Sequence, residues 1–383
     1  MTAPLKDIRI LDFSTLLPGP MATLFLAEAG AEVIKVERPG QGEEMRSYEP
    51  RWGEDSANFA MLNRGKKSLA LDLKDPDQRA RLIPLLKDAD IVVEQFRPGV
   101  MARLGLGYED ITAINPEIIY CSITGYGQTG PKAARAGHDL NYLGDSGLLA
   151  LSCGTPQAPV LPPALIADIA GGTYPAVFNI LLALRDRDRT GKGAYLDISM
   201  SDNLFPFMYW AMAEGQATGR WPGNGDALVT GGSCRYRLYP TRDGRFVAVA
   251  AIEQKFWEAF TQAIGLAPDL RDDTRDPAAT TQAVATLIAS ESADHWRAVF
   301  ARADCCCSVV QTLQEALQDP HFQSRGILDH EVENIDGARQ IALPVPVARN
   351  FRPAPHAARA PSLGADNDLA AEEGPATTKR GAE

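Results

Sequence analysis

The sequence predicts an α/β fold, with a large domain built on a parallel sheet and a smaller α+β domain. Over the first 125 residues, short apolar runs alternate with longer segments of helical periodicity, which is typical of a parallel sheet with crossover helices. A glycine-rich stretch then interrupts the chain, and a second set of strands and helices follows it. Because 383 residues are enough for two hydrophobic cores, we expect two domains.

The first 125 residues contain repeated strand–helix–strand units. The run "IRILDFS" (8–14) predicts a strand, 19–30 a helix that ends at Gly30, and 31–40 a second strand. The pattern continues with a strand over 67–74, a helix over 75–89, and strands over 90–96 and 117–127. This repetition makes the large domain Rossmann-like. The first turn, "STLLPGP", lacks the G-x-G-x-x-G pattern, so a dinucleotide cofactor is not indicated.

The rest of the chain divides at the glycine-rich stretch 215–232. Before it, apolar residues at helical spacing around 177–184 predict a helix, and 194–202 predict a strand. After it, a hairpin around "RDG" and a helix from "EQKFWEAFTQAIG" indicate the smaller domain. We expect the large domain over 1–200, a linker over 201–232, the small domain over 233–312, a return to the large domain over 313–350, and a loosely ordered tail over 351–383.

Composition excludes several function classes. The 38 basic and 49 acidic residues give a net charge of −11, which argues against a dedicated nucleic-acid binder. No apolar run approaches the roughly 18 to 20 residues of a membrane span, and the N-terminus lacks a signal-peptide pattern. We therefore expect a cytoplasmic protein without a membrane partner. The six cysteines, including the triplet 305–307, show no metal-ligand spacing, so no metal site is expected.

Three polar residues have both an ordinary and a catalytic interpretation. His138 is one of only five histidines and stands beside Asp139 in "AGHDLNY"; it could be a hydrogen-bonded histidine or a base. Asp168, in "ALIADIAGG", could simply cap a helix. Glu253, which opens "EQKFWEAF", could be a solvated acid in the first turn of a helix. The residues alone leave these alternatives open.

Four blocks of sequence resemble the class III CoA-transferase (CaiB/BaiF) family, which includes the 2-methylacyl-CoA racemases. They are "DFSTLLPGPMATLFLAEAGAEVIKVERP", "EQFRPGVMARLGL", "NPEIIYCSITGYGQTGP" and "RTGKGAYLDISMSD". They occur in the family's order, and the resemblance runs from about residue 5 to residue 345. The segment "APSLGADNDLAAEEG" matches the family's closing segment only loosely.

The resemblance implies roles for particular residues. "AGHDLNY" resembles the racemase version of its block, in which the histidine is one of two catalytic bases, here His138; the other is Asp168, and Glu253 lies near the histidine. The positions that match the CoA site of the family are Arg38, Leu71, Lys74, Arg97, Arg103, Gly137, Asp139 and Tyr142, with Asp139 left open as a structural residue. The family forms interlocked homodimers. The implied substrate is an acyl-CoA, with CoA as part of the substrate and no other cofactor.

The resemblance implies a racemase of 2-methyl-branched acyl-CoA. Inversion next to a thioester removes the α-proton from one face and returns a proton to the other, which two opposed acid–base groups can do. Histidine titrates near neutrality, and burial can raise the pKa of a carboxylate. Backbone N–H groups of the Gly137–Asp139 turn are candidate donors to the enolate oxygen. A CoA-transferase with Asp168 as a covalent nucleophile is the alternative, and a catalytically silent acyl-CoA-binding protein is a third possibility.

Overall fold

The chain divides into two compact units. The computed structural model describes residues 3–370. The first unit comprises Met1–Leu143, Leu165–Phe205 and His321–Glu383, and the second comprises Gly144–Ala164 and Pro206–Pro320. The chain therefore passes between the units four times, at residues 143/144, 164/165, 205/206 and 320/321.

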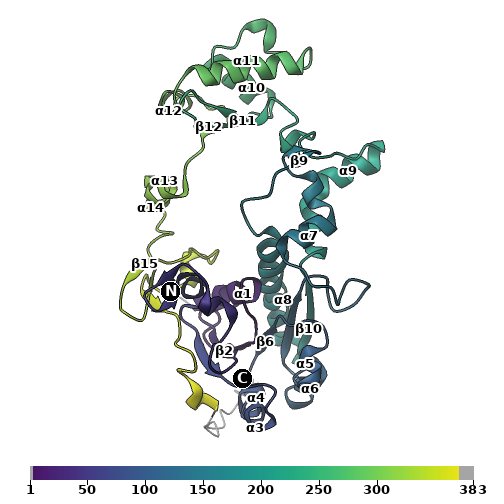
Figure 1. The fold of residues 1–383 in the computed structure, drawn as a ribbon, viewed down its shortest axis with the longest axis vertical. Coiled ribbons are helices and arrows are strands. Elements are labelled where there is room, and N and C mark those ends of the chain that lie inside the picture. The colour runs from purple at the N-terminus through teal and green to yellow at the C-terminus, as the bar shows by residue number, and fades with distance from the viewer. Residues whose placement is uncertain (1–2, 371–383) are drawn as a thin grey trace. The chain divides into compact units, whose positions relative to one another are not determined.

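The first unit is built on a six-stranded parallel sheet, in the order β10-β7-β6-β1-β2-β5. Figure 1 labels β10, β6 and β2 of this sheet. The strands are β1 (Arg9–Asp12), β2 (Glu32–Glu37), β5 (Lys67–Ala70), β6 (Ile91–Glu94), β7 (Ile119–Thr124) and β10 (Ala194–Ser199). Branched apolar side chains dominate the inner strands, as expected where helices cover both faces. The sequence order reverses between β1 and β6, the order of dinucleotide-binding sheets, so the predicted Rossmann-like α/β class is confirmed.

Helices cover both faces of this sheet. On one side lie α1 (Pro18–Glu28) and α8 (Tyr174–Thr190), which pack against each other and against strands. On the other, α4 (Ile83–Asp88) and α6 (Tyr108–Ile114) contribute leucine and isoleucine side chains to a core with Leu11, Val92 and Tyr120. The remaining helices of this unit are α2 (Ala57–Asn63), α3 (Pro76–Ala80), α5 (Val100–Arg103), most of α7 (Asp139–Ser146) and α14 (Pro320–Ser324).

Several predicted elements are shorter than expected. The strand expected over 67–74 ends at Ala70, and the helix expected over 75–89 is two helices, α3 and α4. Pro84 lies in the first turn of α4. Because proline has no N–H to donate and clashes with the preceding turn, α3 cannot continue through it as one helix.

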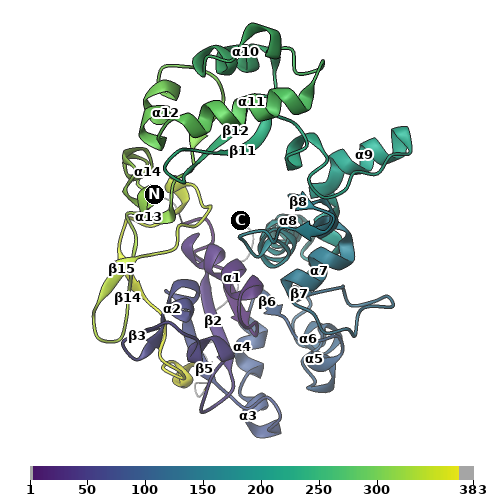
Figure 2. The same cartoon turned by 45° about the horizontal axis from the view of Figure 1, so that its top comes forward.

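The second unit is an α+β structure. Its antiparallel sheet joins β11 (Tyr236–Pro240), β12 (Phe246–Ala250) and β13 (Cys307–Val309). The helices α10 (Gln254–Ala263), α11 (Pro277–Ser290) and α12 (Ala293–Phe300) lie by this sheet (Figure 2). Trp257, Phe260 and Trp296 fill the core between them. The unit also contains α9 (Tyr209–Thr218), α13 (Leu313–Gln318) and the hairpin of β8 (Gly154–Thr155) and β9 (Ala158–Pro159).

The expected linker and tail differ from the structure. Residues 201–232 include a 3₁₀ helix (Asp202–Met208) and α9, and the unit boundary falls at Phe205/Pro206 rather than in the glycine-rich stretch. The chain returns to the first unit at His321 rather than at 313, and residues 144–164 belong to the second unit. Composition alone did not reveal these features, because they depend on contacts between distant residues.

The loose order expected for 351–383 is wrong for its first part. The strand β16 (Ala357–Arg359) pairs with β14 (Glu331–Glu333), which pairs in turn with β15 (Arg339–Ile341). Beyond it, the side chains of Asp366 and Asn367 accept hydrogen bonds from the backbone of Ser68 and Ala70 in β5, both at 2.8 Å. Non-local pairing thus orders a segment whose composition is that of a tail. Residues 371–383 lie outside the described part of the chain.

Candidate active site

Two cavities lie where the parallel strands of the first unit end. The first, of about 420 Å³, is lined by residues that follow β1, β6 and β7, at the point where the strand order reverses. The second, of about 450 Å³, is lined by residues that follow β2 and β5. Thr15 and Phe96 line both. Ligands of open α/β sheets bind at this kind of position.

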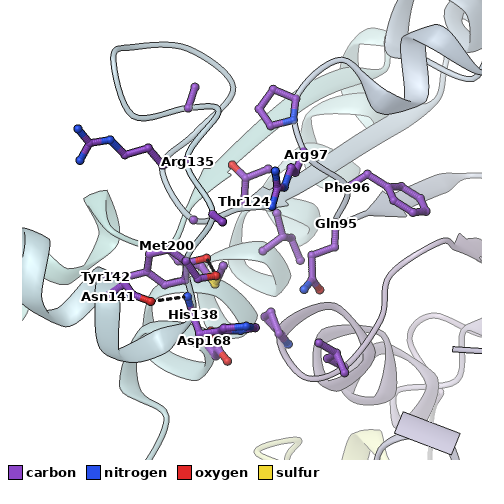
Figure 3. A pocket seen from close by; sticks show the side chains of 18 of the residues that line it. Gln95, Phe96, Arg97, Thr124, Arg135, His138, Asn141, Tyr142, Asp168 and Met200 are labelled. Carbon is purple, nitrogen blue, oxygen red and sulfur yellow. Dashed lines mark hydrogen bonds between the residues drawn. The ribbon is translucent and has the colours of Figure 1, made fainter. Parts of the chain in front are cut away.

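Asp168 lies on the wall of the first cavity (Figure 3). It belongs to the π-helical segment Ala167–Thr173, which continues directly into α8; such segments are often found at functional sites. Asp168 lies inside this segment, not at its N-cap, so the capping interpretation is wrong. The pKa of its carboxyl group is raised to about 6, first by burial and then by the charge of Asp139, while the charge of His138 acts in the opposite direction. This carboxyl group can therefore gain and lose a proton near neutral pH.

His138 lines the same cavity from the start of α7. Its backbone N–H donates to Asn141 Oδ1 at 3.0 Å, and its carbonyl accepts from the backbone N–H groups of Asn141 and Tyr142. These bonds fix the backbone of His138 at the helix N-terminus while the residue stays exposed. Since its charge affects the pKa of Asp168, the two side chains are electrostatically coupled.

Two predicted CoA-site residues hold the loop around His138 in place. The buried Asp139 does not line the cavity; its Oδ1 accepts the backbone N–H of Asp168 at 3.0 Å and so ties α7 to the π-helical segment. This corresponds to the structural role that the sequence left open. Tyr142 lines the cavity and donates its hydroxyl proton to the carbonyl of Gly137 at 2.5 Å. Its ring packs so closely on Gly125 and Gly137 that a Cβ atom would fit at neither position.

The turn at Gly137–Asp139 has two unused backbone donors. The N–H of His138 is taken by Asn141, so it is not available to a ligand. The N–H groups of Gly137 and Asp139 donate to no acceptor in the described part of the protein. Asp139 is also the first residue of α7, where backbone N–H groups attract negative charge.

Thr124 and Gln95 are among the polar side chains of this cavity that sequence reasoning missed, together with those of Thr15, Arg135 and Asn141. Thr124 ends β7 and is buried, and its Oγ1 has no hydrogen-bond partner within residues 3–370. Gln95 Oε1 accepts the N–H of Gly19 in α1 at 3.1 Å, which fixes the orientation of its amide group. The sequence offers one signal for Thr124, a hydroxyl at the end of a buried apolar strand. Because a buried polar atom without a partner is uncommon, Thr124 Oγ1 is a candidate contact for a ligand in this cavity.

The second cavity collects four of the predicted CoA-site residues. Arg38, Lys74 and Arg103 line it together with the buried Leu71. None of the three cations forms an ion pair with a described residue. By contrast, the acids Glu37 and Glu43 at this cavity are paired with Arg46 and Lys35. The three cations are therefore available to an anionic ligand.

The two remaining predicted residues lie elsewhere. Arg97 lines the first cavity, apart from the other three cations, and Figure 3 shows it there with Thr124. Glu253 belongs to the second unit, whereas both cavities consist of residues of the first. It occupies the N-cap position of α10 but makes no side-chain capping hydrogen bond.

Comparison with known sequences gives the family to which the chain is similar. A family profile described as CoA-transferase family III matches residues 5–367, further towards the C-terminus than the resemblance indicated. The chain is 34% identical to the human alpha-methylacyl-CoA racemase over 96% of this chain and 93% of that protein. It is also 34% identical to the acetyl-CoA:oxalate CoA-transferase of Acetobacter aceti, over 85% of each chain.

Comparison with known structures gives the same result. A CaiB/BaiF family protein from Brucella suis superposes with a TM-score of 0.81 and 27% identity, covering 96% of this chain and 98% of that one. The protein therefore belongs to CoA-transferase family III.

Proposed function

We propose that the protein is a racemase of 2-methyl-branched acyl-CoA thioesters, with His138 and Asp168 as opposed acid–base groups. The protein is an enzyme of the CoA-transferase and racemase family. The proteins similar to it include both a racemase and a CoA-transferase. The observation that carries the racemase proposal is the pairing in one cavity of a histidine with a carboxyl group whose pKa is raised to about 6. Such groups exchange protons efficiently near neutral pH.

The proposed reaction is a 1,1-proton transfer. One of the two groups removes the α-proton, and the electron pair of the C–H bond moves onto the thioester oxygen to form an enolate. The other group, in its protonated form, returns a proton to the opposite face of the α-carbon. The two groups exchange roles for the other enantiomer. The reaction needs no redox change and no further cofactor.

The unused N–H group of Gly137, which lines the first cavity, is the proposed donor to the enolate oxygen, whereas Asp139, which the sequence also offered, does not line it. Fixed backbone donors stabilise a developing oxyanion without having to reorganise during the reaction.

Arg38, Lys74 and Arg103 are the proposed partners of the phosphate groups of CoA, because they face the second cavity without a carboxylate partner. In this arrangement, the CoA phosphates lie in the second cavity and the thioester in the first, and the arm between them passes Thr15 and Phe96, which line both cavities.

The proposal extends to a homodimer that brings Glu253 of one chain near His138 of the other. Large apolar side chains on α8 are exposed, with 63% of Phe178 and 52% of Leu182 accessible to solvent. An exposed apolar face of this kind favours association with a second protein surface. The exposed Glu253 is free of a helix-capping role.

The second candidate function is CoA transfer, with Asp168 attacking the thioester. One observation favours it: the Asp168 carboxylate accepts no hydrogen bond from a described residue, so both of its oxygens are available to attack a thioester carbonyl. In this reaction Asp168 becomes an acyl anhydride and CoA leaves as the thiolate. Transferases among the similar proteins, such as that of Acetobacter aceti, keep this alternative in place.

Incubation with a single enantiomer of a 2-methylacyl-CoA in D₂O tests the racemase. We expect deuterium at the α-carbon and formation of the other enantiomer, measured by mass spectrometry and chiral chromatography. A parallel incubation with hydroxylamine tests the transferase by trapping an acyl-enzyme. A hydroxamate on the Asp168 peptide, with CoA transfer to an added carboxylate and no α-deuterium, would overturn the proposal.

A further inference from the structure

The turn between β1 and α1 has an unusual backbone. Leu16 has a φ of 61°, a left-handed backbone conformation that residues other than glycine rarely adopt. Leu16 lines the first cavity, with His138 and Asp168, and its neighbour Thr15 lines both cavities. The turn therefore forms part of the boundary between the two cavities. Its conformation must be imposed by the surroundings, because leucine itself does not favour it.

The backbone of this turn is hydrogen-bonded to a buried ion pair of Lys35 and Glu43. Glu43 Oε2 accepts the N–H of Leu16 at 2.9 Å and lies 3.3 Å from Lys35 Nζ. Lys35 Nζ donates to the carbonyl of Ser14 at 2.8 Å. The two charged groups thus bind the turn on both sides of Thr15, one through a carbonyl and one through an N–H group.

The location of this pair is better explained by positioning than by stability. The side chains of Lys35 and Glu43 are 0% and 1% exposed, and a fully buried ion pair gains little net stability because both ions lose their hydration. Each ion makes a short hydrogen bond to the same turn, at 2.8 Å for Lys35 and 2.9 Å for Glu43, and the other oxygen of Glu43 accepts a longer one from Asn63 Nδ2 at 3.4 Å. The Leu16 side chain packs on an apolar cluster that contains Met21 and Phe25 of α1, so the turn is fixed at its side chain as well.

We propose that Lys35 and Glu43 are positioning residues, which keep the Ser14–Leu16 turn in place and thereby set the position of the thioester relative to His138 and Asp168. This inference rests on the proposed function, because it takes the first cavity as the site of reaction. Displacement of a reacting group by about 1 Å can lower the rate by about 10²-fold. Loss of the pair therefore lowers kcat more than it raises KM.

The test compares Glu43→Ala, Leu16→Gly and the double variant. Glycine adopts a φ of 61° without strain, so in the Leu16→Gly background the ion pair is no longer needed to hold a strained conformation. In the wild-type background, Glu43→Ala is expected to lower kcat about tenfold or more, with KM for the acyl-CoA changed less than about threefold. In the Leu16→Gly background, the same substitution is expected to have an effect below about twofold.

Two further variants separate positioning from folding. Glu43→Gln keeps an oxygen that can accept the N–H of Leu16 and is expected to retain kcat within about threefold of wild type. Glu28 is the matched control: it is also a buried glutamate in ion pairs, with Arg64 and Arg352, but it lines neither cavity. Glu28→Gln is expected to lower the melting temperature while the folded protein keeps its kcat.

Hydrogen exchange of the segment 14–17 gives a readout that does not depend on the reaction. The N–H of Leu16 is expected to exchange faster in Glu43→Ala than in wild type, with or without activity. Equal losses of kcat from Glu43→Ala in both backgrounds, or a loss in Glu43→Gln as large as that in Glu43→Ala, would overturn the inference. So would a rise in KM alone. Wild-type protein without α-proton exchange would instead refute the proposed racemase, and the hydrogen-exchange test would still stand.

Discussion

At the scale of single residues, the first cavity combines groups whose hydrogen bonds are complete with groups that have none. Asp139, Asn141 and Tyr142 use their polar atoms to hold the backbone around His138 and Asp168. The Asp168 carboxylate and Thr124 Oγ1 have no such partner in the described residues. The unpartnered groups cost stability in the free protein, which is the usual mark of a site shaped for a ligand.

Replacing Thr124 by valine removes this hydroxyl without changing the shape of the side chain. Because Oγ1 is buried without a partner, the variant is expected to be as stable as wild type or more so, by up to about 1 kcal/mol. Its affinity for CoA thioesters is expected to fall about three- to tenfold if the ligand supplies the missing partner. Urea unfolding and isothermal titration measure the two effects, with Thr124→Ser as the control that keeps the hydroxyl. Unchanged affinity in Thr124→Val would contradict a role in binding.

The raised pKa of Asp168 predicts a pH-dependent loss of stability. Its pKa is about 6 in the folded protein and 3.8 in its ordinary state, so the folded protein binds the extra proton between these values. The free energy of unfolding therefore falls as pH rises from about 4 to about 6. Above pH 6 the full free-energy cost of burying the charged carboxylate is present. Asp168→Asn removes the cost, and we expect it to stabilise the protein at pH 7.5 by on the order of 1 kcal/mol, since part of the side chain is accessible to water.

Denaturant unfolding of wild type and Asp168→Asn across pH 4 to 7.5 checks this prediction. The two curves of unfolding free energy should converge near pH 4. An Asp168→Asn variant less stable than wild type at pH 7.5 would show that the carboxylate is favourably paired. The same pKa predicts that proton removal by Asp168 rises with pH through about 6 in the rate profile.

At the scale of elements, the π-helical segment sets the position of Asp168. It packs against the chain just after β10, where Gly171 approaches Met200 so closely that a Cβ atom would lie 2.4 Å from the Met200 carbonyl oxygen. At the next position, Gly172, the nearest atoms are side-chain atoms at 3.1 Å. The first contact is with rigid backbone, whereas the second, with the Met200 side chain and the Pro18 ring, is relieved by a shift of a few tenths of an ångström.

Gly171→Ala is therefore expected to be more damaging than Gly172→Ala. The added methyl group must push the π-helical segment away from Met200, which we expect to cost about 1–3 kcal/mol in stability. It should also lower kcat at least about tenfold through displacement of Asp168. Thermal unfolding and α-proton exchange at a temperature where both variants are folded measure these effects. Equal kcat in the two alanine variants would argue against this packing as the determinant of Asp168 position.

The elements also show how far the sequence could predict the structure. Strands such as β2 and β7 lie within the predicted runs, because their branched apolar residues are needed in a buried parallel sheet. The role of Asp139 could not be predicted, since its partner is a backbone N–H 29 residues away. Likewise, Thr124 becomes notable only when the fold leaves its hydroxyl buried without an acceptor. His138 and Asp168 were found through resemblance, not through spacing.

At the scale of the whole molecule, α8 has two different faces. The described residues contain one helical segment, Ala167–Thr190, that is long and apolar enough to cross a membrane by length and composition. Its inner face packs on α1, β7 and β10, which accounts for much of its apolar character. Its outer face exposes Tyr174, Phe178 and Leu182.

Phe178→Asp tests whether this outer face is a subunit interface. If two chains associate through it, a charge at this position must be buried without a partner, so we expect dissociation to monomers. Light scattering coupled to size-exclusion chromatography measures the mass. Arg185→Asp, further along the same exposed helix, is the control for an added acidic residue. A wild-type protein that is monomeric at micromolar concentration would contradict the proposed dimer, and retention of a wild-type dimer in Phe178→Asp would place its interface elsewhere.

The hydrogen bonds between β5 and the segment 364–367 bear on how the protein is made in the cell. The N–H of Ser68 donates to the carboxylate of Asp366, which is synthesised 298 residues later. At about 5–20 residues per second, a ribosome needs roughly 15–60 s to synthesise that interval. Throughout this time the outer strand of the sheet is open to pairing with neighbouring nascent chains. We therefore expect translation speed, and the chaperones that cover emerging chains, to change the yield of folded protein. We expect them to leave the stability of the finished fold unchanged.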